Sequence, residues 1–121
     1  PTPGGLPGND DLGATSSWLM WAMLGMYPAE PGVGGVVVGS PTFPKATITL
    51  ESGKTIVITA DGAAPDAPYV QSLSIDGKPT TKSWIDWKQI SGGATLDFKL
   101  GTTPNPAFGS AQTDRPPSSY P

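Results

Sequence analysis

Seven consecutive apolar residues, Trp18 to Leu24, constrain the fold of this 121-residue chain more than any other feature. At helical spacing they cover the whole circumference of a helix, so no side of that helix suits water. Burying its large side chains would stabilise the fold by roughly 1.5–3 kcal/mol each. The rest of the chain is mostly strand and loop and can cover only one face. The sequence therefore predicts a buried apolar helix whose other neighbours come from an upstream part of the same protein or from another chain.

The ends of this helix are marked by polar and turn-forming residues. Three residues that suit an N-cap precede it: Asn9, Asp10 and Asp11. We expect residues 1–11 to form a loop, and the helix to begin near Asp11 or Leu12. Gly25, followed by a proline, predicts that it ends near Leu24.

Beyond residue 32 the hydrophobic pattern changes to period two, which is typical of strands. Strands are expected over residues 36–38, 45–51, 54–60, 69–76, 78–81 and 94–100. Ser52-Gly53 and Asp76-Gly77 indicate hairpin turns. Residues 83–90 fit an edge strand or a short helical turn capped by Ser83, with the turn favoured.

Together these elements predict an α+β fold, with one apolar helix followed by about six antiparallel strands in a small β-sandwich or β-layer. Three regions are expected: residues 1–31 with the loop and helix, residues 32–100 with the antiparallel strands, and a Pro- and Ser-rich tail over residues 101–121. The tail end, from Pro116 to Ser119, is expected to be disordered or to lie over a neighbour.

The composition excludes several kinds of chemistry. The chain has no Cys and no His, which removes disulfides, thiolate chemistry, zinc sites of the usual kind and His-based triads. Any metal would be one that prefers oxygen ligands, such as calcium. Seven scattered Lys and Arg residues and a net charge of -3 argue against nucleic-acid binding. No apolar run reaches the roughly 18 residues of a membrane span.

Two groups of residues are candidates for a functional site. The run Asn9-Asp10-Asp11 could merely cap the helix, or a carboxylate beside buried surface could act as a general base. Trp84 and Trp87 could form an aromatic platform for a sugar ring, although core packing is the better interpretation of both.

Several segments carry a resemblance to a known family. They are GLPGNDDLGATSSW over residues 5–18, AMLGMYP over 22–28, LESGKT over 50–55 and GGATL over 92–96. With shorter matches between them, they make residues 4–100 similar to the last part of the calcium-dependent exo-α-mannosidases of glycoside hydrolase family 92. The resemblance implies a parent protein with an N-terminal β-sandwich and an (α/α)6 barrel, which hydrolyses terminal α-mannosyl linkages, α-1,2 among them, with inversion.

The resemblance also implies roles for individual residues. The acidic run becomes the general-base loop ahead of the last barrel helix, with Asp11 as the base, Asp10 as its helper and the general acid upstream. Calcium would hold two hydroxyls of the mannose, with Asn9 as one contributor to its site. The expected partners are mannose-containing glycans and the upstream part of the same protein. The expected location is extracellular or in the cell envelope. The isolated segment is expected to be inactive. The alternative is a noncatalytic carbohydrate-binding or structural β-sandwich module.

Overall fold

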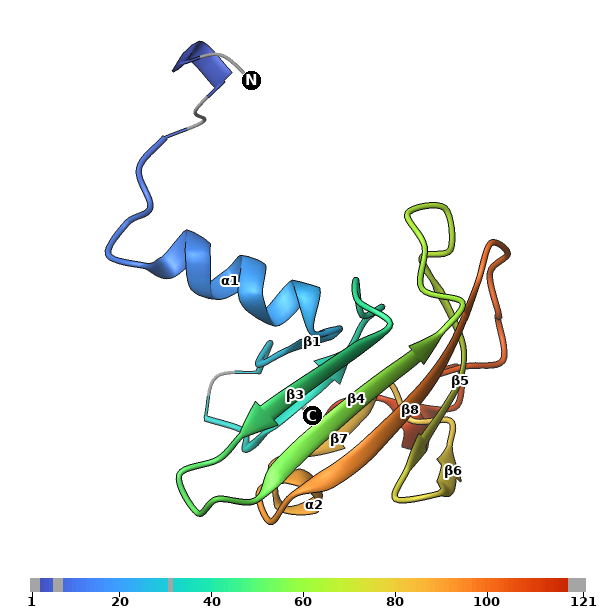
Figure 1. Cartoon of the computed structure of the whole chain (residues 1–121). Helices are drawn as coiled ribbons and strands as arrows, with labels where there is room; N and C mark the ends of the chain where they lie inside the picture. The colour runs from blue at the N-terminus through green and yellow to red at the C-terminus, as the bar shows by residue number, and fades with distance from the viewer. Residues whose placement is uncertain (1–2, 6–7, 31, 118–121) are drawn as a thin grey trace.

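The computed structural model describes residues 3–5, 8–30 and 32–117, and shows two sheets, a main helix and several short helical turns (Figure 1). The helical elements are η1 (Pro3–Gly5), α1 (Ala14–Met23), α2 (Trp87–Ile90) and η2 (Gln112–Asp114). The smaller sheet has the strand order β1 (Met26–Tyr27), β2 (Gly35–Val38), β7 (Trp84–Asp86). The larger has the order β3 (Lys45–Thr49), β4 (Thr55–Asp61), β8 (Ala94–Gly101), β5 (Tyr69–Ile75), β6 (Lys78–Thr80). The predicted α+β class is confirmed.

Both predicted hairpins are present in the larger sheet. β3 and β4 pair antiparallel around Ser52-Gly53, with Thr49 opposite Thr55. β5 and β6 pair around Asp76 and Gly77, whose φ angles are +50° and +74°. Positive φ at both central residues is what a type I′ turn requires, and its twist matches that of the flanking strands.

The expectation of a purely antiparallel region is wrong at one strand pair. β8 pairs in parallel with β4, placing Leu96 opposite Ile58, and antiparallel with β5 on its other side. The described residues form eight strands rather than six, because β1 and β7 pair on either side of β2 in a second sheet. A parallel pair needs a long crossover, here the chain between β4 and β8, and no local sequence pattern encodes such a pairing.

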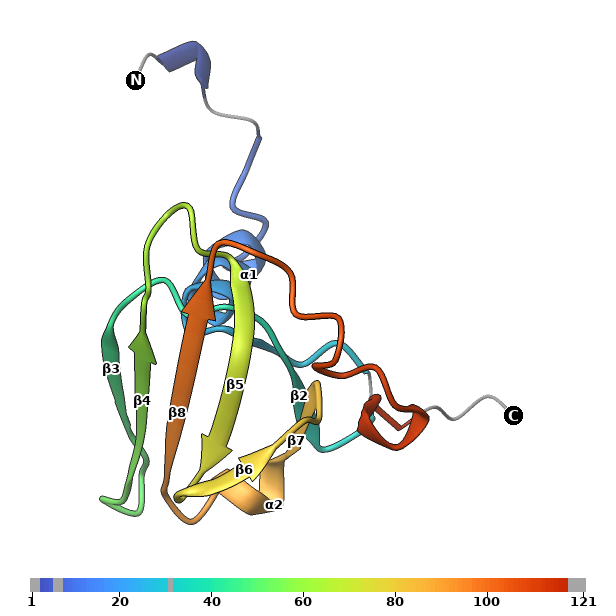
Figure 2. The same ribbon diagram turned by 90° about the vertical axis from the view of Figure 1, so that its right-hand side faces the viewer.

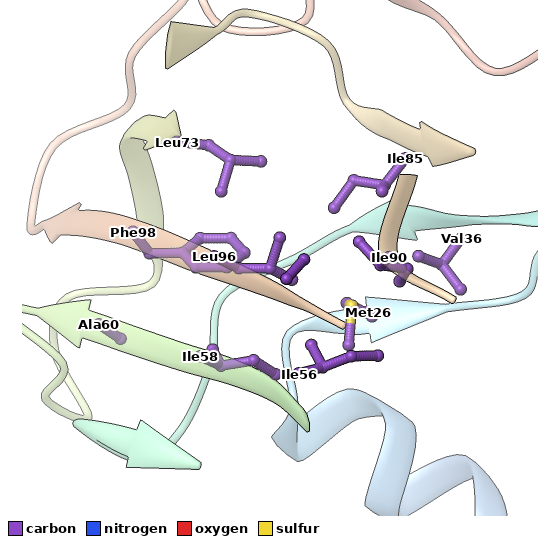
Figure 3. Packing of buried hydrophobic residues seen from close by; sticks show 11 residues of the cluster. Met26, Val36, Ile56, Ile58, Ala60, Leu73, Ile85, Ile90, Leu96 and Phe98 are labelled. Carbon is purple, nitrogen blue, oxygen red and sulfur yellow. The ribbon is translucent and has the colours of Figure 1, made fainter. Parts of the chain in front are cut away.

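The hydrophobic core lies between the two sheets. The larger sheet contributes Ile56, Ile58, Ala60, Leu73, Ala94, Leu96 and Phe98, and the opposite side contributes Met26, Val36, Ile85 and Ile90. Figure 3 shows the side chains from the two sides meeting between the ribbons. Alternation of buried and exposed residues along β4 and β8 directs one face of the larger sheet toward this core.

Residues 83–90 adopt both of the structures considered for them. The first part forms β7, and α2 follows directly. Its cap is Asp86 rather than Ser83, because the Asp86 side chain accepts from the Lys88 N–H and the Gln89 side chain accepts from the Asp86 N–H. This reciprocal arrangement is a capping box, and it fixes where the strand ends and the turn begins.

Helix α1 is shorter than predicted and is covered on one side only. It begins at Ala14, after an N-cap at Gly13, and Gly25 follows its C-cap at Leu24 with a φ of +72°. None of its residues is buried, and Met20 is 64% exposed. Only its C-terminal end packs on the core, through Trp21 and Leu24. The apolar circumference of α1 therefore lacks cover from the described part of this chain.

Candidate active site

The loop before α1 is attached to the first turn of the helix by four hydrogen bonds. The Ala14 N–H donates to the Asp11 carbonyl oxygen at 3.2 Å, and the Thr15 N–H donates to the Asp10 carbonyl oxygen at 3.1 Å. Ser16 donates both its N–H and its hydroxyl to Asp10 Oδ1, at 2.8 and 2.7 Å. The first N–H groups of a helix have no partner within it, so these contacts satisfy them and fix the loop. One side chain of the acidic run, Asp10, does act as a cap.

Asp11 is placed quite differently from its neighbour. It is exposed, and its carboxylate takes part in none of the side-chain hydrogen bonds found among the described residues. Asp11, Leu12 and Gly13 have φ angles of +53°, +60° and +89°, so three successive residues are left-handed. Leu12 is fully exposed. Non-glycine residues are rare in this region, and such conformations cluster at functional sites.

Asn9 is exposed immediately ahead of the two carboxylates. Its amide oxygen and the adjacent carboxylate oxygens belong to the ligand class that calcium prefers. Within the described ranges, however, no three His, Cys, Asp or Glu residues gather as a metal-binding group. The loop can thus supply part of a calcium shell, with further ligands from elsewhere, and the calcium site stays a prediction.

The two candidate platform residues do not share one exposed surface. Trp84 is 9% exposed and lies on β7, with its ring against Gly35, where an added Cβ would come within 2.1 Å of it. Trp87 is 39% exposed and begins α2. Trp84 is therefore a packing residue, while Trp87 retains surface that could contact another group.

Trp87 also borders an apolar cavity that the sequence did not reveal. The cavity measures about 270 Å³ and lies between α1 and the larger sheet. Its walls include Ser17, Met20, Trp21, Leu24, Ile48 and Trp87. Its lining residues come from α1, β1, β3, β4 and α2, which explains why no local sequence pattern indicated the cavity.

Ser16 is a residue of this candidate site that sequence reasoning missed. It is the third residue of α1, and both of its donors hold the Asp10 carboxylate. A hydroxyl residue in the first helical turn, shortly after an acidic loop, was the available signal.

Comparison with known proteins places this loop and helix in a family. Residues 1–102 match the glycosyl hydrolase family 92 catalytic domain. The chain belongs to glycoside hydrolase family 92. The two sheets and the helix of this family 92 chain also match solved structures. The family GH92 alpha-mannosidase BT3965 from Bacteroides thetaiotaomicron superposes with a TM-score of 0.91 and 36% identity over 98% of the chain.

Other similar proteins support the same family membership. The family GH92 inverting mannosidase BT2199 from the same bacterium has a TM-score of 0.82 and 32% identity over 88% of the family 92 chain. An uncharacterized secreted glycosidase of Arthroderma benhamiae is 33% identical over 97% of it. The chain spans only 15% of that glycosidase, 16% of BT3965 and 14% of BT2199. No helix among the residues described here has the length and hydropathy of a membrane span.

Proposed function

We propose that this chain is part of an inverting exo-α-mannosidase that removes terminal α-mannosyl residues, α-1,2-linked ones foremost, from glycans. The match to the family's catalytic domain supports the proposal, as do two solved neighbours whose names specify mannosidases, one of them inverting. In this proposal the chain contributes the loop that carries the general base.

The exposed Asp11 carboxylate is the observation that carries the proposal. A general base must reach its proton through a hydrogen bond and so must have free acceptor capacity. Asp11 has that capacity, because its carboxylate oxygens accept no hydrogen bond from the described residues. Asp10 has one oxygen already engaged by Ser16, which suits a positioning residue better.

The proposed reaction follows from this difference. Asp11 accepts a proton from a water molecule as that water attacks the anomeric carbon from the face opposite the leaving group. A carboxylic acid from the rest of the protein protonates the leaving oxygen. Inversion requires the two carboxyl groups to stand about 6.5–9.5 Å apart, so that water fits between base and sugar. Asp10 keeps the loop on the helix while this occurs.

Calcium and export belong to the proposal as well. Calcium, when bound, would orient sugar hydroxyls, and the exposed Asn9 would contribute an amide oxygen to its site. A relative named a secreted glycosidase supports an extracellular or cell-envelope location.

The test compares substitutions in the longer protein with an activated aryl α-mannoside as substrate. Asp11→Asn should lower kcat by about 10²–10⁴-fold, since a general base contributes that much. Asp10→Asn should cost far less, because an amide oxygen still accepts from Ser16. Asp66→Asn, at an exposed loop position, is the matched control and should leave kcat unchanged.

A rescue experiment separates a base from a merely structural residue. Azide needs no base to attack, so it should restore turnover of Asp11→Ala and give a mannosyl azide of inverted configuration. Full activity of both Asp10→Ala and Asp11→Ala would refute the assignment. Turnover by the isolated 121-residue chain would refute the requirement for a separate acid. Calcium-independent binding of mannose that quenches Trp87 fluorescence, without any hydrolysis by the longer protein, would favour the noncatalytic module.

A further inference from the structure

A second cavity lies far from the loop before α1. It measures about 410 Å³, within the range of about 300–1,000 Å³ that is usual for small-molecule sites. One wall comes from β5, β6 and the residues that follow β6. The other comes from the segment after β8, which runs alongside β5 and β7 (Figure 2). No residue from 8–24 contributes to it.

The segment that forms the second wall is fixed in place by hydrogen bonds to the sheets. Gln71 Nε2 donates to the Thr103 carbonyl oxygen at 2.8 Å, and Asn105 Nδ2 donates to the Gln71 carbonyl oxygen at 2.9 Å. The Gly109 N–H donates to the Thr81 carbonyl oxygen at 2.8 Å. The cavity is therefore preformed, which reduces the entropy lost when a ligand binds.

The far end of that segment is attached through Ser83. The Ser83 N–H and hydroxyl both donate to the Asp114 carbonyl oxygen, at 2.9 and 3.0 Å. Gly109 also lies close to this serine, because a Cβ built on Gly109 would be 2.9 Å from Ser83 Cβ. Such close approach leaves the segment little freedom to move away from the sheet.

Asp114 is the residue of this cavity whose carboxylate most needs a hydrogen-bond donor. It is 8% exposed and is the one buried charged residue of the described core. Its carbonyl is used by Ser83, but its carboxylate takes part in none of the side-chain hydrogen bonds found among the described residues. Buried polar groups normally have a partner.

Asp114 is one of the residues that line the cavity. None of the described residues holds a side-chain oxygen or nitrogen that is both fully enclosed and without a partner. The Asp114 carboxylate, which has no hydrogen-bond partner in the described part of the chain, is therefore not fully enclosed. A ligand in the cavity could supply the missing donor.

The remaining walls indicate the class of ligand. Leu73, Pro79 and Phe108 supply apolar surface, while Thr80 and Lys82 add polar groups opposite Asp114. Because the lining contains one acidic residue, Asp114, and one basic residue, Lys82, the cavity has no net charge that would favour an ion. A neutral molecule with hydroxyl groups and an apolar C–H face matches this combination. We infer that this cavity binds a neutral monosaccharide unit, with the Asp114 carboxylate accepting from its hydroxyls.

This inference does not depend on the proposed activity. The general-base loop and the cavity share no residues, so either assignment can fail without the other. A sugar held here would be an accessory contact to a glycan, or a free sugar, and the site would bind it without cleaving it.

The inference is tested by titrating the full isotope-labelled chain with methyl α-mannopyranoside and following backbone amide shifts by NMR. Saturable shifts are expected in both walls, near Thr80–Lys82 and near Asn105–Phe108. Asp114→Asn keeps the backbone contacts and should weaken binding by about tenfold or more, as loss of a charged acceptor does. Ala107→Trp, at an exposed position on the rim, should block the cavity, and Asp66→Asn should change nothing.

Three results would overturn the inference. The first is an absence of shifts in both walls with a folded chain. The second is binding that neither Asp114→Asn nor Ala107→Trp weakens. The third is binding of ethylammonium or acetate, used as charged probes, in the same cavity without binding of the sugar. Free mannose as a further probe distinguishes a site for the free sugar from one that requires a glycosidic substituent.

Discussion

Removing the Asp10 carboxylate tests the most specific contact in the loop. In Asp10→Ala the Ser16 N–H and hydroxyl both lose their acceptor, while the backbone bonds to Ala14 and Thr15 can remain. We expect the first turn of α1 to open more often and the loop backbone that carries Asp11 to become less fixed.

The magnitude follows from the exposure of the site. Loss of a helix-capping side chain costs about 0.5–2 kcal/mol. Loss of a negative charge near a helix N-terminus adds about 0.3–1 kcal/mol, reduced by salt. Because water can reach Ser16 and replace the lost acceptor, the expected cost is about 1 kcal/mol, at the lower part of the combined range. Asp10→Asn keeps an acceptor oxygen and should cost less.

Amide hydrogen exchange measures this change where it occurs. The local free energy of opening at Ser16 should fall by about 1 kcal/mol, which is roughly a fivefold loss of protection. The Leu96 amide, in the centre of the larger sheet, should keep its protection in the same variant. Unchanged exchange at Ser16, or equal loss at Leu96, would refute the local capping role of Asp10.

Three further substitutions test the core, the strained turn and the packing of the smaller sheet. Phe98→Ala should lower the free energy of unfolding by about 3–5 kcal/mol in urea denaturation, and a loss below about 1 kcal/mol would place Phe98 outside the core. Leu12→Gly should leave the amide exchange protection of α1 equal or higher, because glycine adopts the left-handed conformation at position 12 without strain. Leu12→Val should lower that protection. Higher protection in Leu12→Val than in Leu12→Gly would exclude strain at this position. Gly35→Ala would put a Cβ within 2.1 Å of the Trp84 ring and should cost about 1–3 kcal/mol, so an unchanged melting temperature would contradict that contact.

Local sequence signals were sufficient to predict several elements of the fold. The two hairpins could be predicted because Asp76-Gly77 and Ser52-Gly53 encode their own turns over a few residues. The end of α1 could be predicted because Gly25 adopts a left-handed conformation that few other residues tolerate. Its apolar circumference predicted a buried helix, whereas the described residues leave α1 without any buried residue, so the expected neighbours beyond this segment stay a prediction.

Contacts between residues distant in sequence decided the strand pairing and the arrangement of the candidate sites. The parallel pairing of β4 with β8 joins segments more than 30 residues apart, and no local period distinguishes it from an antiparallel one. Asp10 and Asp11 are identical in type and adjacent in sequence, so only the fold could show that the Asp10 carboxylate caps the helix while the Asp11 carboxylate has no hydrogen-bond partner among the described residues. The cavity at Asp114 likewise arises from residues about 30 positions apart. Sequence determined which side chains are available, whereas tertiary packing determined which of them have partners, because pairing depends on neighbours that chain order does not specify.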